Sequence, residues 1–242
     1  MNKLYVVGIG PGAYEEMTIR AVKALEQCQV IVGYTLYVDL IREHFPQKEF
    51  LTTPMRQETE RCRLALDTAQ SGRTAAMVCS GDAGVYGMSG VLLEMGREYP
   101  QVEIEVVPGI TAAVSGAACL GAPLMHDFAV ISLSDLMTPW ELIERRLQAA
   151  AEADFVICLY NPSSRKRADY LKRACDVVLR FRKAGNLCGM VRNIGRDDRS
   201  SSICTLERLR ETKTDMFTTV FIGNSSTKEV NGHLVTPRGY IL

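Results

Sequence analysis

The chain contains 242 residues, which is enough for one large domain or for two domains of ordinary size. Lys and Arg together number 28, as do Asp and Glu, so no overall field favours nucleic acid or an anionic membrane as a partner. No apolar run approaches the roughly 18–20 residues that a membrane-spanning helix needs. Met1-Asn2-Lys3 leads directly into an apolar run and leaves no room for a signal peptide. We therefore predict a cytoplasmic protein.

The eight cysteines are scattered and form no C-x-x-C pair. Four lie in or beside apolar runs, which is typical of free buried thiols in a reducing compartment. The three histidines, His44, His126 and His233, are isolated from one another and from any cysteine cluster. We therefore predict neither a disulfide framework nor a metal site made by this protein alone.

In the first half of the chain, short apolar runs alternate with segments of helical periodicity. Thr18 is placed to cap a helix that carries Ile19, Val22 and Leu25 on one face. Arg61 and Arg63 are expected on the polar face of a later helix. We predict strands over residues 4–7, 29–32, 75–79 and 103–107, and helices from residue 18, over residues 36–41, 58–69 and 91–99, and over residues 111–120.

Gly121-Ala122-Pro123 punctuates the pattern, and we place the domain boundary there, with domains over residues 1–122 and 123–242. The second half resumes the alternation, so we predict a second α/β sheet. Its strands are expected over residues 128–133, 154–159, 187–191, 216–222 and 239–242, and its helices over residues 139–150, 164–183 and 205–211.

Three strands of the first half end in glycine-containing loops: Gly8-Ile9-Gly10-Pro11-Gly12, Gly81-Asp82-Ala83-Gly84, and Pro108-Gly109-Ile110-Thr111-Ala112. Open α/β sheets bind their ligands where strands end in such loops. The three loops therefore predict one crevice lined largely by backbone.

The first loop also fits the dinucleotide fingerprint G-x-G-x-x-G/A, but Pro11 and a polar stretch delay the helix to about Thr18. No acidic residue stands near Tyr34, where that fingerprint places its ribose-binding acid. Asp82 has two readings. Its carboxylate can accept hydrogen bonds from a ligand, or it can form an Asx turn that caps the next helix.

Together these loops make the sequence resemble the tetrapyrrole (corrin/porphyrin) methyltransferases. Within that family, the second-half motifs resemble those of the members that methylate C17 of precorrin-3B or cobalt-factor III. These motifs are Leu159-Tyr160-Asn161-Pro162-Ser163-Ser164, Val191-Arg192-Asn193-Ile194-Gly195-Arg196, Ile222-Gly223-Asn224-Ser225 and Thr236-Pro237-Arg238-Gly239-Tyr240. The resemblance spans essentially the whole chain.

The resemblance implies two α/β domains of the class III methyltransferase type, a cofactor cleft between them, and a homodimer. It implies S-adenosyl-L-methionine as cofactor, S-adenosyl-L-homocysteine as its product, and a cyclic tetrapyrrole, with or without bound cobalt, as substrate. The cofactor-binding positions that it implies are Pro11, Gly81, Asp82, Val85, Thr111, Ala112, Tyr160, Asn193 and Ile194.

One departure from the family pattern bears on the substrate. Relatives that methylate uroporphyrinogen carry an Asp just after the second strand, where this chain has Tyr34. The resemblance therefore argues against that substrate position, and we take Tyr34 and Tyr37 as catalytic candidates, although ordinary helix aromatics would look the same. Arg56, Arg192 and Arg196 are candidates for substrate carboxylates.

The primary hypothesis is a C17-methyltransferase of cobalamin synthesis that also contracts the ring. Two alternatives stay open: another tetrapyrrole methylase acting at C11 or C20, and a nucleotide-binding regulator without catalysis.

Overall fold

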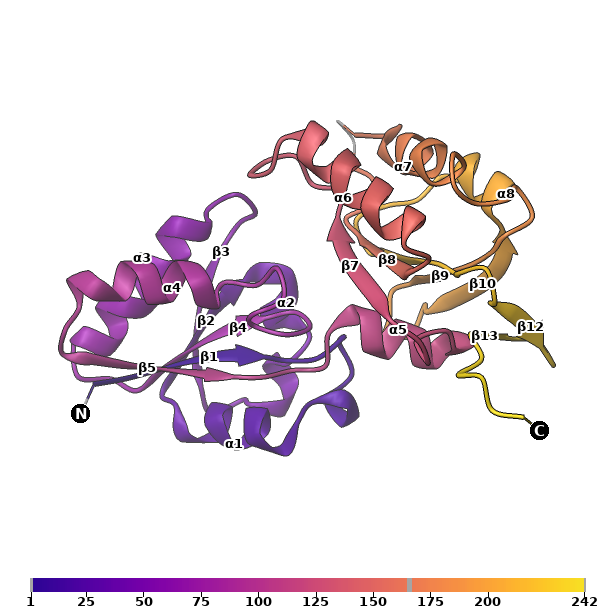
Figure 1. Cartoon of the computed structure of the whole chain (residues 1–242). Helices are drawn as coiled ribbons and strands as arrows, with labels where there is room; N and C mark the ends of the chain where they lie inside the picture. Colours follow the sequence, from indigo (N-terminus) through magenta and orange to yellow (C-terminus); the bar gives the residue numbers. More distant parts are fainter. Residues whose placement is uncertain (1, 165–166, 242) are drawn as a thin grey trace. The chain divides into compact units, whose positions relative to one another are not determined.

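The computed structural model describes residues 2–164 and 167–241 and divides into two compact units, one ending at Thr111 and the other beginning at Ala112 (Figure 1). Both units are α/β, as the sequence predicted.

The first unit is built on a five-stranded sheet in which every described pair is parallel. The strand order is β3-β2-β4-β1-β5. The carboxyl ends of all five strands therefore meet at one edge, the edge that carries the glycine loops. The strands are β1 (Asn2–Gly8), β2 (Val30–Tyr34), β3 (Glu49–Thr53), β4 (Ala75–Cys79) and β5 (Val102–Val107).

Helices cover both faces of this sheet. Helix α1 and the segment around α2 pack on one face, while α3 and α4 pack on the other, and the central strands bury side chains on both sides. This two-sided burial explains why the central strands are nearly continuous apolar runs. The helical segments are η1 (Tyr14–Glu16), α1 (Ile19–Gln27), α2 (Thr35–Asp39), η2 (Arg42–His44), α3 (Glu58–Gln70), α4 (Ser89–Met95) and η3 (Gly96–Glu98).

Helix α1 begins where the sequence predicted, because the Thr18 hydroxyl accepts a hydrogen bond from the Ala21 N–H at 3.0 Å. The predicted face is confirmed in part. Leu25 is buried and Val22 packs against the core, whereas Ile19 is 75% exposed. Ala21 and Ala24 are buried beside Leu25.

The second unit has a mixed five-stranded sheet with strand order β10-β9-β11-β8-β7. Only β7 and β8 pair in parallel, and the other three pairs are antiparallel. Strands β7, β8 and β9 nevertheless end at the same edge. These strands are β7 (Phe128–Ser132), β8 (Val156–Tyr160), β9 (Leu187–Arg192), β10 (Ser200–Thr205) and β11 (Thr218–Ile222).

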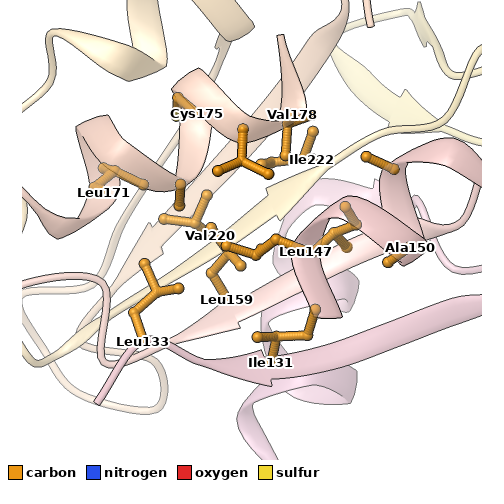
Figure 2. Close-up of a cluster of buried hydrophobic side chains, with 14 of the residues drawn as sticks. Ile131, Leu133, Leu147, Ala150, Leu159, Leu171, Cys175, Val178, Val220 and Ile222 are labelled. Atoms are coloured by element: carbon orange, nitrogen blue, oxygen red, sulfur yellow. The ribbon is translucent and has the colours of Figure 1, made fainter. Parts of the chain in front are cut away.

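Three helices cover one face of this sheet: α6 (Trp140–Glu152), α7 (Tyr170–Val178) and α8 (Leu206–Arg210). Figure 2 shows the core that they enclose, with Leu147 of α6 and Leu171 of α7 lying over Leu159 and Val220 of the strands. The opposite face is covered by α5 (Ala112–Leu120), which packs Ala113, Ala117 and Leu120 against the strands.

The break between the units differs from the predicted boundary at residue 122. Helix α5 belongs to the second unit, because it packs on β9, β10 and β11. Gly121 and Ala122, at the predicted boundary, form strand β6 (Gly121–Ala122), which pairs with β13 (His233–Val235), and β13 pairs in turn with β12 (Lys228–Val230). This three-stranded sheet joins segments more than a hundred residues apart.

Several predicted elements were shorter or absent. The helix expected over 164–183 is the shorter α7, and residues 165 and 166 lie outside the described part of the chain. Residues 239–241 form no strand, and Leu242 is likewise outside the description. All eight cysteines are free, and six of them are buried, as predicted. Among the described residues, no helix is long and apolar enough to cross a membrane.

Candidate functional site

Three glycines bring the ends of β1, β4 and β5 into close backbone contact. A Cβ at Gly109 would lie 2.2 Å from the Gly81 carbonyl oxygen, and a Cβ at Gly8 would lie 2.7 Å from both that oxygen and the Gly109 nitrogen. No side chain fits in these positions. This glycine junction (Gly8, Gly81 and Gly109) is therefore the reason for the glycines that the sequence places at the three strand ends.

Backbone hydrogen bonds join the first two loops directly. Gly10 and Gly81 exchange N–H to carbonyl hydrogen bonds of 3.1 and 2.7 Å, and both have positive φ, +73° and +69°. Pro11 follows and is buried. The chain then makes one short 3-10 turn before α1 begins, so the helix start does not lie at the glycines as the dinucleotide fingerprint requires.

Asp82 holds the second and third loops together. Its Oδ1 accepts hydrogen bonds from the N–H groups of Gly84 and Val85 at 2.8 and 3.1 Å, which is an Asx turn. Its Oδ2 accepts from the Gly109 N–H at 2.9 Å. The next helix starts only at Ser89 and has no side-chain cap, so Asp82 does not cap it. The carboxylate instead fixes the loops relative to each other.

The residues after Asp82 point outward. Val85 is 37% exposed and Tyr86 is 57% exposed, with Tyr86 at a φ of +53°. A rigid turn that keeps apolar side chains in solvent is suited to contact a ligand. Thr111, the last residue of the first unit, precedes α5 directly.

Tyr34 and Tyr37 lie at the carboxyl end of β2 and in α2, with their rings edge to face at 5.1 Å between centroids. Arg61 of α3 reaches the same place, because its Cζ lies 5.8 Å from the Tyr34 ring centroid. The prediction that Arg61 lies on the polar face was wrong, since this residue is only 5% exposed. Arg63 is on that face, as predicted, and pairs with Glu60.

The second unit positions its candidates with side-chain hydrogen bonds. Tyr160 ends β8, and its hydroxyl accepts a hydrogen bond of 2.6 Å from the Ala113 N–H in the first turn of α5, next to Ala112. Asn161 follows at a φ of +52° and donates to the Ser132 hydroxyl at the end of β7. The start of α5 is thus tied to the ends of two strands.

Asn193 and Ile194 follow β9. Asn193 is 6% exposed with a φ of +53°, and its Nδ2 donates to Asp198 at 2.6 Å while its Oδ1 is buried without a partner. Ile194 packs on α5, where a Cβ added to Gly116 would lie 3.0 Å from its Cδ1. The unpaired Oδ1 is an acceptor that a ligand N–H or O–H would satisfy.

The three arginines predicted to bind substrate have different surroundings. Arg56 is exposed, at a φ of +70°, in the loop before α3. Arg192 is paired, with Nε 2.7 Å from Asp215 and Nη1 3.7 Å from Asp198. These partners raise the pKa of Arg192, so its charge is largely compensated within the protein. Arg196 lies over the Phe217 ring at 5.0 Å.

Two features escaped the sequence analysis. The acidic partners of Arg192 were missed because Asp198 lies in the loop before β10 and Asp215 in the turn before β11, and neither position has a periodic signal. The burial of Arg61 was missed because helical periodicity assigns an arginine to the polar face. In the described part of the chain, no group of three or more His, Cys, Asp or Glu side chains could hold a metal ion.

Comparison with known proteins agrees with the resemblance seen in the motifs. Residues 3–210 match the family model described as Tetrapyrrole (Corrin/Porphyrin) Methylases. The chain is 45% identical to a probable cobalt-factor III C(17)-methyltransferase of Salmonella typhimurium, over 99% of this chain and 100% of that protein. It is 38% identical to a precorrin-3B C(17)-methyltransferase of a Sinorhizobium species, over 98% and 96% of the two chains.

Among solved structures, the fold is similar to that of the methyltransferase CobJ. The TM-score is 0.88 with 36% sequence identity, and the match covers 97% of this chain and 99% of that one. The similarity therefore includes both units.

Proposed function

The chain belongs to the tetrapyrrole (corrin/porphyrin) methylases, and we propose that it transfers a methyl group to C17 of precorrin-3B or cobalt-factor III in cobalamin synthesis. We further propose that this methylation is coupled to contraction of the macrocycle, as the resemblance implies. The observation that carries the proposal is the end-to-end match to C17-methyltransferases, in which 240 aligned residues span the whole of the Salmonella protein. Tyr34 at the end of β2 is consistent with a substrate other than uroporphyrinogen.

We propose S-adenosyl-L-methionine as the methyl donor, which supplies a carbon bound to a positively charged sulfur when it is present. The residues fit such a ligand in both units. In the first, the glycine junction holds the three loops together, and Asp82 retains acceptor capacity for hydroxyl or ammonium donors. In the second, the Asn193 Oδ1 is an unused acceptor.

The residues proposed to hold the donor fall in two groups. In the first unit they are Pro11, Gly81, Asp82, Val85 and Thr111, and in the second they are Ala112, Tyr160, Asn193 and Ile194. Most of them act through backbone groups or apolar contact, and Asp82 and Tyr160 also fix the loops that carry the others.

Catalysis by this chain would come mainly from positioning. Methyl transfer needs two reactants held in line and kept from water, and a metal is not required. The loops of the first unit are held in one conformation by the glycine junction and by Asp82, so little reorganisation is needed on binding. Tyr34 and Tyr37 would contact the macrocycle, and Arg56, Arg192 and Arg196 remain proposals for its carboxylates.

Incubation with S-adenosyl-L-methionine and the trimethylated isobacteriochlorin, with and without cobalt, tests the proposal. We expect a tetramethylated, ring-contracted product by mass spectrometry from at least one substrate form. Methylation at C11 or C20 would identify another member of the family instead. Absence of product from both forms, with the donor bound, would favour a non-catalytic nucleotide-binding regulator.

Calorimetry provides a separate test of the cofactor. We expect S-adenosyl-L-methionine and S-adenosyl-L-homocysteine to bind and NAD not to bind. We also propose a homodimer, which the resemblance implies, and a cytoplasmic location, which the composition favours. Sedimentation equilibrium of the purified chain tests the first, because a monomer at micromolar concentration would contradict it, and cell fractionation tests the second.

A further inference from the structure

Arg61 is a buried cation without a counter-ion. It is 5% exposed, and the one acceptor that the structure gives its guanidinium is the Pro54 carbonyl oxygen, 3.0 Å from Nη2. Its Nε is buried and has no hydrogen-bond partner. Among residues 2–164 and 167–241, no carboxylate lies within ion-pair distance of this side chain. Burial of a guanidinium without a counter-ion has a free-energy cost of desolvation that no ion pair offsets.

A second unpaired polar group lies beside it. Thr53 is the last residue of β3 and pairs in register with Tyr34 at the end of β2. Its hydroxyl is buried without a hydrogen-bond partner, and the residue as a whole is 7% exposed. Arg61 contacts the same pair of strand ends through the Tyr34 ring. Two unsatisfied donors and an aromatic ring thus meet at the carboxyl edge of the sheet, where α/β proteins bind ligands.

The position of Arg61 near the start of its helix raises the free-energy cost of burying its positive charge. Arg61 lies in the first turns of α3, where the helix dipole disfavours a cation. The two acidic residues of that turn, Glu58 and Glu60, are exposed, and Glu60 pairs with Arg63. Gln57, the residue before the helix, makes no side-chain cap. A compensating anion therefore has to come from outside the described protein.

We propose that Arg61, with the Thr53 hydroxyl, binds a carboxylate arm of the cyclic tetrapyrrole, with the Tyr34 ring against the macrocycle. The identity of the ligand rests on the proposed function, whereas the anion preference rests on the residues themselves. Arginine is suited to this task because its fork matches a carboxylate. Because Nε is enclosed, binding includes a local movement of residues 54–57, a segment that already contains Arg56 in a left-handed conformation.

Four variants test this site in the full chain: Arg61→Met, Arg61→Lys, Thr53→Val, and the control Arg63→Met, which changes an exposed arginine on the same helix. The probe is uroporphyrin III, a cyclic tetrapyrrole with acetate and propionate arms, titrated by fluorescence. Affinity for S-adenosyl-L-homocysteine and unfolding in urea are measured on the same preparations.

We expect Arg61→Met to weaken uroporphyrin III binding about ten- to a hundredfold and Thr53→Val about two- to tenfold, because the guanidinium supplies an opposite charge and the hydroxyl supplies a single donor. Arg61→Lys should retain part of the affinity, and Arg63→Met should change it less than about twofold. Affinity for S-adenosyl-L-homocysteine should not change. Free Arg61→Met and Thr53→Val should be as stable as the wild type or more so, since each loses an unsatisfied buried group. If Arg61 or Thr53 served only to stabilise the fold, its substitution would instead lower the free energy of unfolding.

Equal uroporphyrin III affinity in Arg61→Met and Arg63→Met would overturn the proposal. Should Arg61→Met not fold, Arg61→Lys and Thr53→Val decide, and wild-type affinity in both would overturn it. The two proposals fail separately. Binding that depends on Arg61 without methylation of any tetrapyrrole contradicts only the proposed function. Methylation of C17 with an unchanged KM in Arg61→Met contradicts only the anion site.

Discussion

The two units position their candidate residues by different means. In the first, a parallel sheet brings five carboxyl ends to one edge, and glycines let three exit loops touch backbone to backbone. In the second, a mixed sheet brings fewer strand ends together, and polar side chains such as Tyr160 and Asn161 make the connections. The difference predicts that the first edge tolerates no added atoms, whereas the second loses stability in small steps as polar groups are removed.

The largest effect is expected at the glycine junction. In Gly109→Ala the new Cβ would lie 2.2 Å from the Gly81 carbonyl oxygen, a backbone atom that cannot move aside as the end of a flexible side chain could. We expect a loss of more than about 3 kcal/mol of unfolding free energy, or no folded protein. Gly90→Ala is the matched control, because nothing lies within 4 Å of its Cβ position in α4. It should be neutral or stabilising by about 0.5–1 kcal/mol. Similar urea midpoints for the two variants would contradict the account of the junction.

The second unit should respond most strongly at Arg182. This side chain is 4% exposed, pairs with Asp154, and donates to the carbonyl oxygens of Ala151, Phe155 and Gly223. Burial lowers the pKa of Arg182, but Asp154 opposes that change, and the group remains a cation. Arg182→Met should cost about 3–5 kcal/mol, because it leaves these acceptors unpaired.

Arg180→Met is the control for this change. The Arg180 side chain is 58% exposed and its guanidinium pairs with Glu144 at 3.4 Å, so its removal should cost at most about 1 kcal/mol. Urea unfolding of both variants measures the difference, and equal losses would show that the buried network contributes no more than a surface pair.

The two units are alike in their buried thiols, which make a prediction about pH. Burial raises the pKa of Cys79 in the first unit to about 11 and that of Cys158 in the second to about 12. Because an unfolded thiol ionises near ~8.5, the unfolded state loses its proton first, and stability falls as pH rises through this window. Each thiol should cost about 1.4 kcal/mol per pH unit between these values. Below pH 8 the contribution should be constant.

Urea unfolding under reducing conditions at pH 7, 9 and 10 measures this slope. Cys158→Ala should be less stable than the wild type at pH 7, because it leaves a cavity, but its slope above pH 9 should be shallower by about one proton. An unchanged slope would mean that Cys158 ionises equally in the folded and unfolded states.

Asp82 should affect ligand affinity more than folding. Asp82→Ala removes the acceptor for three backbone N–H groups in partly exposed loops, where water can replace it. We expect S-adenosyl-L-homocysteine to bind about 1–3 kcal/mol more weakly, with the fold retained. Asp82→Asn keeps an oxygen for the Asx turn, so its affinity for S-adenosyl-L-homocysteine should lie between those of the wild type and Asp82→Ala. Calorimetry measures the series, and wild-type affinity in folded Asp82→Ala would leave this carboxylate a loop-fixing role alone.

The sequence predicted the parts of the fold that local pattern determines. Strand β4 is apolar throughout and lies where it was expected, and the Thr18 cap marks the start of α1. The edge strands β3 and β10 were not predicted, because Glu49–Thr53 and Ser200–Thr205 are short and partly polar. Their pairing depends on a neighbouring strand rather than on their own periodicity.

The candidate site likewise contains residues that local sequence pattern predicted and residues that it missed. The glycine loops were predicted because a strand followed by glycines has a direct steric meaning. The burial of Arg61 was not predicted, because it depends on contacts with Tyr34 and Pro54. Both residues lie outside helix α3, so the helical periodicity contains no sign of these contacts. Arg192 was assigned to substrate from its charge alone, and its pairing with Asp215 arises from the turn before β11. Long-range ion pairs of this kind leave no periodic signal in one sequence.

The smallest effect is expected at the connection between β8 and α5, and it tests whether side-chain ties in the second unit act singly. Tyr160→Phe removes the hydroxyl that accepts from the Ala113 N–H in the first turn of α5, where a helix N–H has no partner within the helix. We expect a loss of about 0.5–1.5 kcal/mol in unfolding free energy and a decrease in S-adenosyl-L-homocysteine affinity of similar size. Tyr170→Phe is the control, since that hydroxyl donates to Asp135 at 2.6 Å outside the proposed cofactor residues. It should lower stability by a similar amount and leave affinity unchanged, so equal affinity losses in the two variants would contradict a specific role for Tyr160.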